Sequence, residues 1–257
     1  MKKIIRRCGG FVYRMACPIV DPISVIFVVP RYLDFFIDSV KYSTKIKKDS
    51  QKLRLLDFHP ILNDKTKKTQ FDPQYFYQGV WAFDKIYKSK TPNHVDVGSQ
   101  TNLVSFLTTI TNVKFVDIRP LEAKLNNFTS IKGSIMELPF DDNSIHSLSC
   151  LHVAEHIGLG RYGDPLDPLG TEKACKELAR ALAVGGSLYF SLPIGIPRIC
   201  FNAHRVHSIG QILKYFSDLK LEELIVIDDD GKYVENPKIG DYDSAIYSGG
   251  LFHFKKI

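Results

Sequence analysis

Short apolar runs separated by helical patterns dominate the last two thirds of the chain, and they predict an α/β fold. Phe76, Val80, Phe83 and Tyr87 share helical spacing and predict a helix over 72–87, with this stripe turned toward the core. An amphipathic pattern predicts a second helix over 171–184, closed by Gly185 and Gly186. The predicted strands are 94–97, 113–117, 145–150, 187–192, 221–227 and 250–255.

Two of these strands end in an aspartate, and the two aspartates are 21 residues apart. Gly98 follows Asp96, where a glycine lets the backbone approach a ligand, and Asp117 can accept hydrogen bonds from ribose hydroxyls. Only Gly98 of the usual glycine set is present, with Ser99 beside it, so a pyrophosphate ligand is not favoured. The pattern predicts a nucleoside crevice; the alternative is that both aspartates only cap loops.

Five segments occur in an order that is specific to one class of enzymes: DVGS, VDIR, GSIMELPFDDNSI, LHVAEHI and ELARALAVGGSLYFSLP. From Phe71 to the C terminus the chain resembles class I S-adenosylmethionine-dependent methyltransferases. The segments EHIGLGRYGDPLDP and CFNAHRVHS are similar to a bacterial methyltransferase-like family of unknown function. The resemblance implies a Rossmann-like, seven-stranded, mostly parallel sheet with helices on both faces, an antiparallel C-terminal strand and an N-terminal helical appendage.

The resemblance also implies S-adenosylmethionine as the cofactor and no metal. The backbone at Gly98 and Ser99 would approach its methionine end, and Asp117 would hold the ribose diol through charge-assisted hydrogen bonds. Ser134 stands where the family often has an aspartate near adenine. Tyr75, Gln78 or Trp81 of the first helix are further candidates for ligand contact. The predicted cofactor residues are Asp96, Gly98, Ser99, Asp117, Ile118, Ser134 and Ile135.

Methyl transfer needs alignment and, for a hydroxyl acceptor, one base. Polar side chains suited to this task follow the fourth and fifth strands, at the ligand-binding edge of an open sheet. The predicted catalytic residues are Glu155, His156, Arg161, Asp164, His204 and Arg205, and further candidates in the same two loops are His152, Tyr162, Asn202 and His207. The glycine-rich stretch 158–170 is either a substrate lid or an ordered loop. The alternative for Glu155 and His156 is that they brace the sheet.

Charge divides the chain into two parts, 1–70 and 71–257. Residues 1–70 hold 15 Lys and Arg against 6 Asp, a net charge of +9, while the remainder carries −3. The apolar run 23–29, bracketed by prolines, is too short to span a membrane, which takes about 20 residues, and it does not fit a signal peptide. Residues 1–70 either contact an anionic membrane surface or an acidic glycan, or cover residues 71–257. Nucleic acid is a less favoured partner of this part.

Five scattered cysteines without metal-ligand spacing predict free thiols in a reducing compartment, and hence a cytoplasmic protein at most peripheral to the membrane. The function predicted from these observations is methyl transfer to a small molecule or a cell-surface sugar. One alternative is a catalytically inactive scaffold in polysaccharide assembly. A third is a zinc peptidase, because His152, Glu155 and His156 match the HxxEH motif, although two glycines soon follow it.

Overall fold

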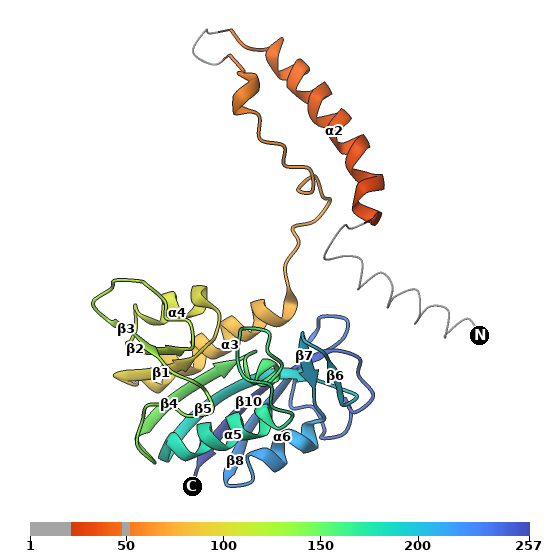
Figure 1. Ribbon diagram of the computed structural model, residues 1–257. Helices are drawn as coiled ribbons and strands as arrows, with labels where there is room; N and C mark the ends of the chain where they lie inside the picture. The colour runs from red at the N-terminus through yellow and green to blue at the C-terminus, as the bar shows by residue number, and fades with distance from the viewer. Residues whose placement is uncertain (1–21, 48–51) are drawn as a thin grey trace, which may run out of the picture. The chain divides into compact units, whose positions relative to one another are not determined.

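The computed structural model describes residues 22–47 and 52–257 (Figure 1). The chain divides into two compact units, Met1–Gln70 and Phe71–Ile257. Five of the basic residues counted in 1–70, from Lys2 to Arg14, lie outside the described residues, as do Cys8 and Cys17. Cys150, Cys175 and Cys200 in the described part are free thiols.

The described residues of the first unit form a long helix, α2 (Pro22–Ser43), and a short 3-10 helix, η2 (Leu55–Asp57). α2 continues through Pro30, so the apolar run 23–29 is the first half of this helix rather than a separate short segment. No helix in the part of the chain that the structure describes is long and apolar enough to cross a membrane.

The second unit is built on one eight-stranded sheet in the order β3-β2-β1-β4-β5-β10-β8-β9. β3, β2, β1, β4 and β5 pair in parallel, β10 is antiparallel to both β5 and β8, and β9 is antiparallel to β8. The strands are β1 (Asn93–Val97), β2 (Asn112–Asp117), β3 (Phe128–Lys132), β4 (Ile145–Leu151), β5 (Leu182–Ile194), β8 (Leu219–Ile227), β9 (Tyr233–Glu235) and β10 (Ser248–Lys256).

The predicted Rossmann-like architecture is therefore confirmed, including the antiparallel C-terminal strand, but the sheet has eight strands instead of seven. The additional strand, β9, has only three residues, and this length is too short for an alternating pattern to reveal it. A separate two-stranded hairpin, β6 (Arg198–Cys200) and β7 (His204–Val206), follows β5.

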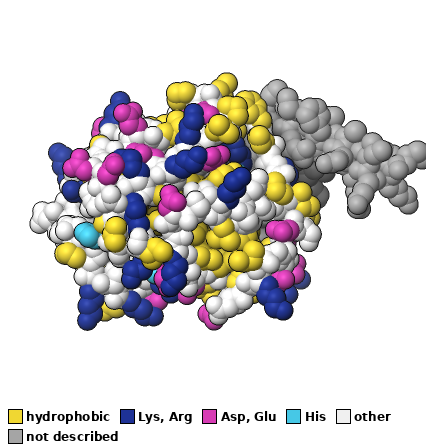
Figure 2. All heavy atoms as spheres, turned by 90° about the horizontal axis from the view of Figure 1, so that it is seen from below, with side chains coloured by type: hydrophobic (Ala, Val, Ile, Leu, Met, Phe, Trp, Pro, Cys, Tyr) yellow, Lys and Arg dark blue, Asp and Glu magenta, His cyan; other side chains and the backbone are white. Residues whose placement is uncertain are grey.

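Helices cover both faces of the sheet. α3 (Pro73–Ser89) and α4 (Thr101–Leu107) pack in one hydrophobic cluster, which includes Trp81 and Leu107. α5 (Gly170–Ala181) and α6 (Ile209–Tyr215) pack in the other cluster, with Leu178 and Phe216. On the face that Figure 2 shows, hydrophobic side chains lie among acidic and basic ones, and the two charge signs are interspersed.

The helix predicted over 72–87 exists as α3, but its apolar stripe faces the opposite way from the prediction. Phe76, Val80 and Tyr87 are each more than half exposed, whereas Trp81 and Ile86 are buried against the sheet. The helix carries two apolar faces, and the one chosen from the sequence is the wrong one. On the buried face, Nε1 of the Trp81 indole also donates a 2.8 Å hydrogen bond to Glu223.

The helix predicted over 171–184 ends earlier, at Ala181, and β5 begins at Leu182. The strand contains an irregularity, because Leu182 pairs with Ile145 and Ser187 with Ser147 while the four residues between have no partner in β4. Gly185, at φ +77°, makes this irregularity possible. The two glycines thus belong to a strand and do not close a helix.

Candidate functional site

A cavity of about 370 Å³ opens at the carboxyl ends of β1, β2 and β4, the edge at which open α/β sheets bind ligands. Five of the seven predicted cofactor residues line this cavity: Gly98, Asp117, Ile118, Ser134 and Ile135. Asp96 and Ser99 lie outside it, buried beneath the turn that follows β1. Its other walls come from the turn after β4 and the loop beyond it, with His152, Val153, His156, Tyr162 and Asp164.

Gly98 brings the backbone close to the cavity. It lies at φ +67°, and its amide donates a 3.0 Å hydrogen bond to the carbonyl of Val116 in the neighbouring strand. A Cβ atom at this position would lie 3.1 Å from Val153 and 3.7 Å from Oδ2 of Asp117. Only a residue without a side chain fits here easily, so the glycine keeps the space between the two strand ends open.

Asp117, at the end of β2, presents a carboxylate to this space. Oδ1 accepts a 2.7 Å hydrogen bond from the amide of Arg119, and its side chain is 16% exposed. The Arg119 guanidinium lies 4.3 Å from the centre of the Tyr162 ring, which comes from the loop on the other side of the cavity. Asp117 is thus held in one orientation while it still faces the cavity.

Ser134 is placed at the cavity, but its hydroxyl has a local role. Oγ accepts a 3.1 Å hydrogen bond from the amide of Met136 and so closes the turn after β3. Ile135 is buried beside it and offers an apolar wall. This end of the cavity therefore suits a flat apolar group more than a charged one.

Asp96 fixes the turn from below and makes no contact with the cavity. It accepts a 3.0 Å hydrogen bond from the Ser99 amide and another from the Ser149 hydroxyl, and burial raises its pKa to about 6. Ser149 and Ser147 each lie 2.8 Å from a ring nitrogen of His94, and burial lowers the pKa of this histidine to about 3. A buried polar chain thus anchors β1 to β4 under the site.

We expect the free-energy cost of His94→Gln to be smaller at acid pH than at neutral pH. Below pH 6.5, the ordinary pKa of histidine, His94 binds a proton in the unfolded chain. In the folded protein, burial keeps the His94 imidazole neutral until about pH 3. Native stability therefore loses about 1.4 kcal/mol per pH unit at this site, and the variant does not. Asp96 has the opposite effect on stability, since its raised pKa lets the folded state bind a proton before the unfolded state does. This effect is present in both the native protein and His94→Gln.

Urea unfolding measures this difference: the cost of His94→Gln should be about 2 kcal/mol lower at about pH 5 than at about pH 7. His146→Gln is the matched control, because His146 lies in the neighbouring strand β4 with an exposed side chain. An equal cost at both pH values would contradict a neutral buried imidazole.

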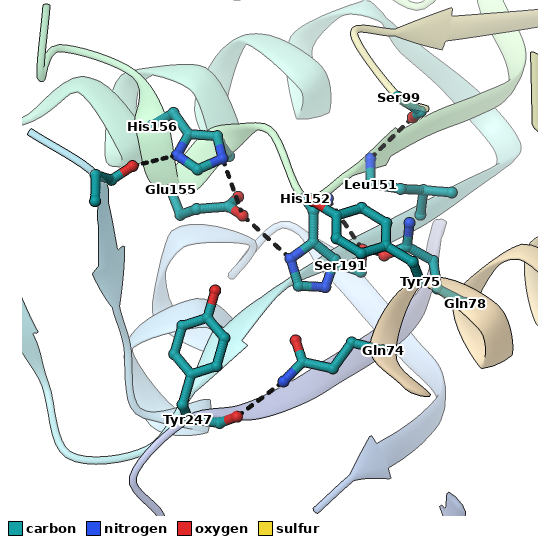
Figure 3. Close-up of polar contacts among 12 residues, drawn as sticks. Gln74, Tyr75, Gln78, Ser99, Leu151, His152, Glu155, His156, Ser191 and Tyr247 are labelled. Carbon is teal, nitrogen blue, oxygen red and sulfur yellow. Dashed lines mark hydrogen bonds and ion pairs between the residues drawn. The ribbon is translucent and has the colours of Figure 1, made fainter. Parts of the chain in front are cut away.

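The turn after β4 places two histidines around one buried carboxylate, as Figure 3 shows. Glu155 in η3 (Ala154–His156) is 1% exposed, and its Oε1 lies 3.2 Å from Nδ1 of His152 and 3.6 Å from Nε2 of His156. Burial alone would raise the pKa of Glu155, but the hydrogen bond from His152 and the electrostatic effect of His152 and His156 lower it overall. The site thus holds a carboxylate in its charged form.

His152 is aimed by a strained backbone and by contacts from distant parts of the chain. It lies at φ +54°, a conformation that costs a residue with a side chain about 1–2 kcal/mol. Its amide donates a 2.9 Å hydrogen bond to the Ser191 carbonyl, and the Ser191 hydroxyl donates one of 2.6 Å to Gln78. Strain that is maintained in this way is typical of functional positions.

One ring nitrogen of His152 remains available. In the described part of the chain, buried Nε2 of His152 has no hydrogen-bond partner, and neither has Oε2 of Glu155. The ring of Tyr75 packs on the imidazole, with 5.3 Å between the ring centroids. Gln74, one residue earlier in α3, donates a 2.8 Å hydrogen bond to the carbonyl of Tyr247. A buried imidazole nitrogen without a partner therefore lies in the wall of the cavity, which His152 lines.

His156, Arg161 and His204 support this arrangement from outside. Nδ1 of His156 donates to the carbonyl of Ala203 over 2.6 Å, and the Arg161 guanidinium donates to the same oxygen over 3.0 Å. The His204 ring packs against Tyr247, with 4.9 Å between the centroids. The structure brings these three predicted residues together, but through Ala203 and Tyr247 and not through the base itself.

Asp164 and Arg205 hold the loop 158–170. Oδ2 of Asp164 accepts a 2.6 Å hydrogen bond from the Gly158 amide. The buried guanidinium of Arg205 donates to the carbonyls of Ile157 and Asp167, the latter over 2.9 Å. The segment is thus an ordered loop over the cavity, tied at both ends, and the structure gives these two predicted catalytic residues a positioning role.

We expect Gly158→Ala to destabilise the protein far more than Gly163→Ala in the same loop. Both glycines have positive φ, +78° and +84°. A Cβ at Gly158 would lie 2.1 Å from the carbonyl oxygen of Asp167, whereas a Cβ at Gly163 would meet nothing within 4 Å. Gly163→Ala should cost about 1–2 kcal/mol for the backbone conformation alone, and Gly158→Ala at least about 3 kcal/mol. Urea unfolding of both variants measures this, and equal losses would contradict the tied loop.

The zinc-peptidase interpretation of HxxEH does not fit this geometry. The motif lies on a strand end and a single 3-10 turn, and the imidazoles of His152 and His156 turn toward Glu155 and not toward a common metal position. Within the described ranges, 22–47 and 52–257, no group of three or more His, Cys, Asp or Glu side chains could hold a metal ion.

Some residues of the site have no signal in the sequence. Ser191 lies in the segment ELARALAVGGSLYFSLP, which indicates no role for it, and Tyr247 belongs to no motif. Gln78 and Trp81, considered as ligand contacts, are instead buried between α3 and the sheet. His152 carried two signals: its place after the fourth strand made it a candidate base, and the HxxEH motif suggested a metal ligand.

Comparisons with known proteins agree with the fold. Residues 111–217 match a family described as "Caenorhabditis protein of unknown function, DUF268". No curated protein matches the chain. Among solved structures, the chain is similar to N-methyltransferase NodS from Bradyrhizobium japonicum in complex with S-adenosyl-L-homocysteine, at 12% identity over 76% of this chain and 93% of that one, with a TM-score of 0.51.

It is also similar to geranyl diphosphate C-methyltransferase from Streptomyces coelicolor, in complex with Mg²⁺, geranyl diphosphate and S-adenosyl-L-homocysteine. The identity is 13% over 71% of this chain and 79% of that one, and the TM-score is 0.52. Phe71–Ile257 thus has the fold of class I S-adenosylmethionine-dependent methyltransferases. At these identities, the similarity establishes the fold, and the chemistry has to be argued from the site.

Proposed function

We propose that the chain is an S-adenosylmethionine-dependent methyltransferase that acts on a hydroxyl group of a small molecule or a cell-surface sugar. The observation that carries the proposal is the carboxylate of Asp117, which faces a cavity at the end of β2 opposite the open turn at Gly98. A carboxylate at this position accepts hydrogen bonds from two adjacent hydroxyls, as the ribose of a nucleoside offers.

The cavity residues fit this cofactor in three respects. Asp117 would hold the ribose, Ile118 and Ile135 offer apolar surface to the adenine, and the missing side chain of Gly98 leaves room for the amino-acid end. When it is bound, the cofactor supplies an electrophilic methyl group on a sulfonium. The protein has to align the acceptor with that methyl group and remove the proton of the acceptor.

In this proposal His152 takes the proton. Its unpartnered Nε2 is buried beside the ring of Tyr75, and its Nδ1 lies 3.2 Å from the charged carboxylate of Glu155. A hydroxyl that hydrogen-bonds to Nε2 can transfer its proton there as the new carbon–oxygen bond forms. The negative charge of Glu155 stabilises the resulting imidazolium, so Glu155 is a positioning residue and His152 is the base.

A sugar acceptor is supported by the side chains around this base. Tyr75 and Tyr247 provide flat apolar surfaces, and Gln74 and His204 carry amide and imidazole groups that hydrogen-bond to hydroxyls.

The experiment that tests the acceptor is transfer of a radioactive methyl group from S-adenosylmethionine into a surface-glycan extract, followed by mass spectrometry of the labelled fraction. We expect label in hydroxyl-bearing glycans or small molecules. Cofactor binding without transfer to any fraction would favour the alternative, an inactive methyltransferase-like scaffold in polysaccharide assembly.

A further inference from the structure

Helix α2 presents an exposed apolar stripe along one side. Val29, Leu33, Phe36, Ile37 and Val40 recur at helical spacing, and their exposed fractions lie between 49% and 64%. Such a stripe on a helix that cannot span a bilayer is typical of helices that lie in the membrane interface.

In the described part of the first unit, residues 58–65 contact the opposite side of α2. The ring of Phe35 meets Phe58 edge-on, with 5.6 Å between the centroids, and Lys65 pairs with Asp38 over 3.1 Å. Arg31 also donates a hydrogen bond to Asn63 on this side. The returning segment thus fixes which face of α2 is outward, and the apolar stripe is the side it leaves uncovered.

The charge around the stripe indicates what would cover it. Residues 22–47 and 52–70 hold 9 Lys and Arg against 4 Asp, and Lys45 and Lys47 follow directly after the helix. An apolar stripe combined with excess positive charge is complementary to a bilayer that contains anionic lipid. The same excess disfavours a second copy of the unit as the occupant, because two such units would repel.

We propose that α2 lies on an anionic membrane surface with its apolar stripe inserted among the lipid headgroups. The stripe supplies the apolar contact and the surrounding lysines supply the electrostatic attraction. This inference is independent of the proposed methyl transfer, since it depends only on residues of the first unit. It would place the second unit close to acceptors that are linked to lipid.

Sedimentation of the full chain with lipid vesicles tests the proposal. We expect the native protein to bind vesicles of phosphatidylcholine mixed with phosphatidylglycerol, and to bind pure phosphatidylcholine at least about tenfold more weakly. Raising the salt concentration should also weaken binding, because it screens the attraction. The variant Leu33→Asp/Ile37→Asp should lose at least about tenfold in affinity for the mixed vesicles.

The matched control is Tyr42→Asp/Leu56→Asp, which adds the same charge at exposed positions of the same unit outside the stripe. It should keep most of the native affinity, and circular dichroism should show equal helix content in both variants. Equal losses in the two variants would overturn the proposal, and so would native protein that fails to bind mixed vesicles. A dimer in solution that only the stripe variant dissociates, without vesicle binding, would assign the stripe to a second copy instead.

Discussion

His152→Ala is expected to lower methyl transfer by about 100- to 10,000-fold, the range that a positioned general base contributes. The substitution removes Nε2, which is the buried ring nitrogen left without a partner beside the proposed acceptor pocket. Affinity for S-adenosylhomocysteine should be unchanged, because the ribose contact is made by Asp117 on the other strand. Transfer is measured with radioactive cofactor and the fraction that the native protein labels.

Two further variants separate the role of His152 from a loss of structure. Glu155→Gln keeps the shape of the buried side chain but removes its charge, so transfer should fall and its pH profile should shift. His146→Ala, at an exposed position of β4, should transfer at the native rate. Full activity of His152→Ala, with the cofactor still bound, would assign proton removal to another group.

Much of the fold can be predicted from the sequence, because parallel strands and their crossover helices leave a regular pattern. Strands buried on both faces are continuous apolar runs, and the segments after them contain the turn residues of the family. The errors arise where the pattern is ambiguous. α3 has two apolar faces, and only its packing against the sheet shows that Trp81 is inside and Val80 outside.

The start of β5 illustrates another limit. Leu182 and Ala183 continue the helical spacing of α5, so no local signal separates the helix from the strand. The boundary depends on the pairing of Leu182 with Ile145, a contact between distant segments. A sequence window does not contain that information.

The residues of the candidate site also differ in how far the sequence predicts them. The positions of Asp117 and Gly98 at the cavity could be predicted, because both residues lie at strand ends on the ligand-binding edge of the sheet. His152 could be predicted only as one of several polar side chains after the fourth strand, since its orientation depends on Ser191 and Gln78, and the Ser191–Gln78 hydrogen bond joins residues 113 positions apart. Asp164 and Arg205 have residue types suited to catalysis, and only the hydrogen bonds of the loop show that they hold backbone in place.

Asp117→Ala is expected to weaken S-adenosylhomocysteine binding by about 100-fold, because it removes two charge-assisted hydrogen bonds to the ribose. The side chain is held at Oδ1 by the amide of Arg119, so the carboxylate is oriented before the ligand arrives. Asp117→Asn should also bind weakly, since an amide has one acceptor oxygen and not two. Asp218→Ala, at an exposed aspartate far along the chain from the cavity residues, is the matched control.

We expect the cavity at the ends of β1, β2 and β4 to bind a nucleoside through Asp117. Isothermal titration calorimetry with S-adenosylhomocysteine tests this most directly, on the native protein, Asp117→Ala and Asp218→Ala. One binding site is expected in the native protein and in Asp218→Ala, and its loss in Asp117→Ala. No heat of binding with correctly folded native protein, or equal affinity in Asp117→Ala, would contradict it.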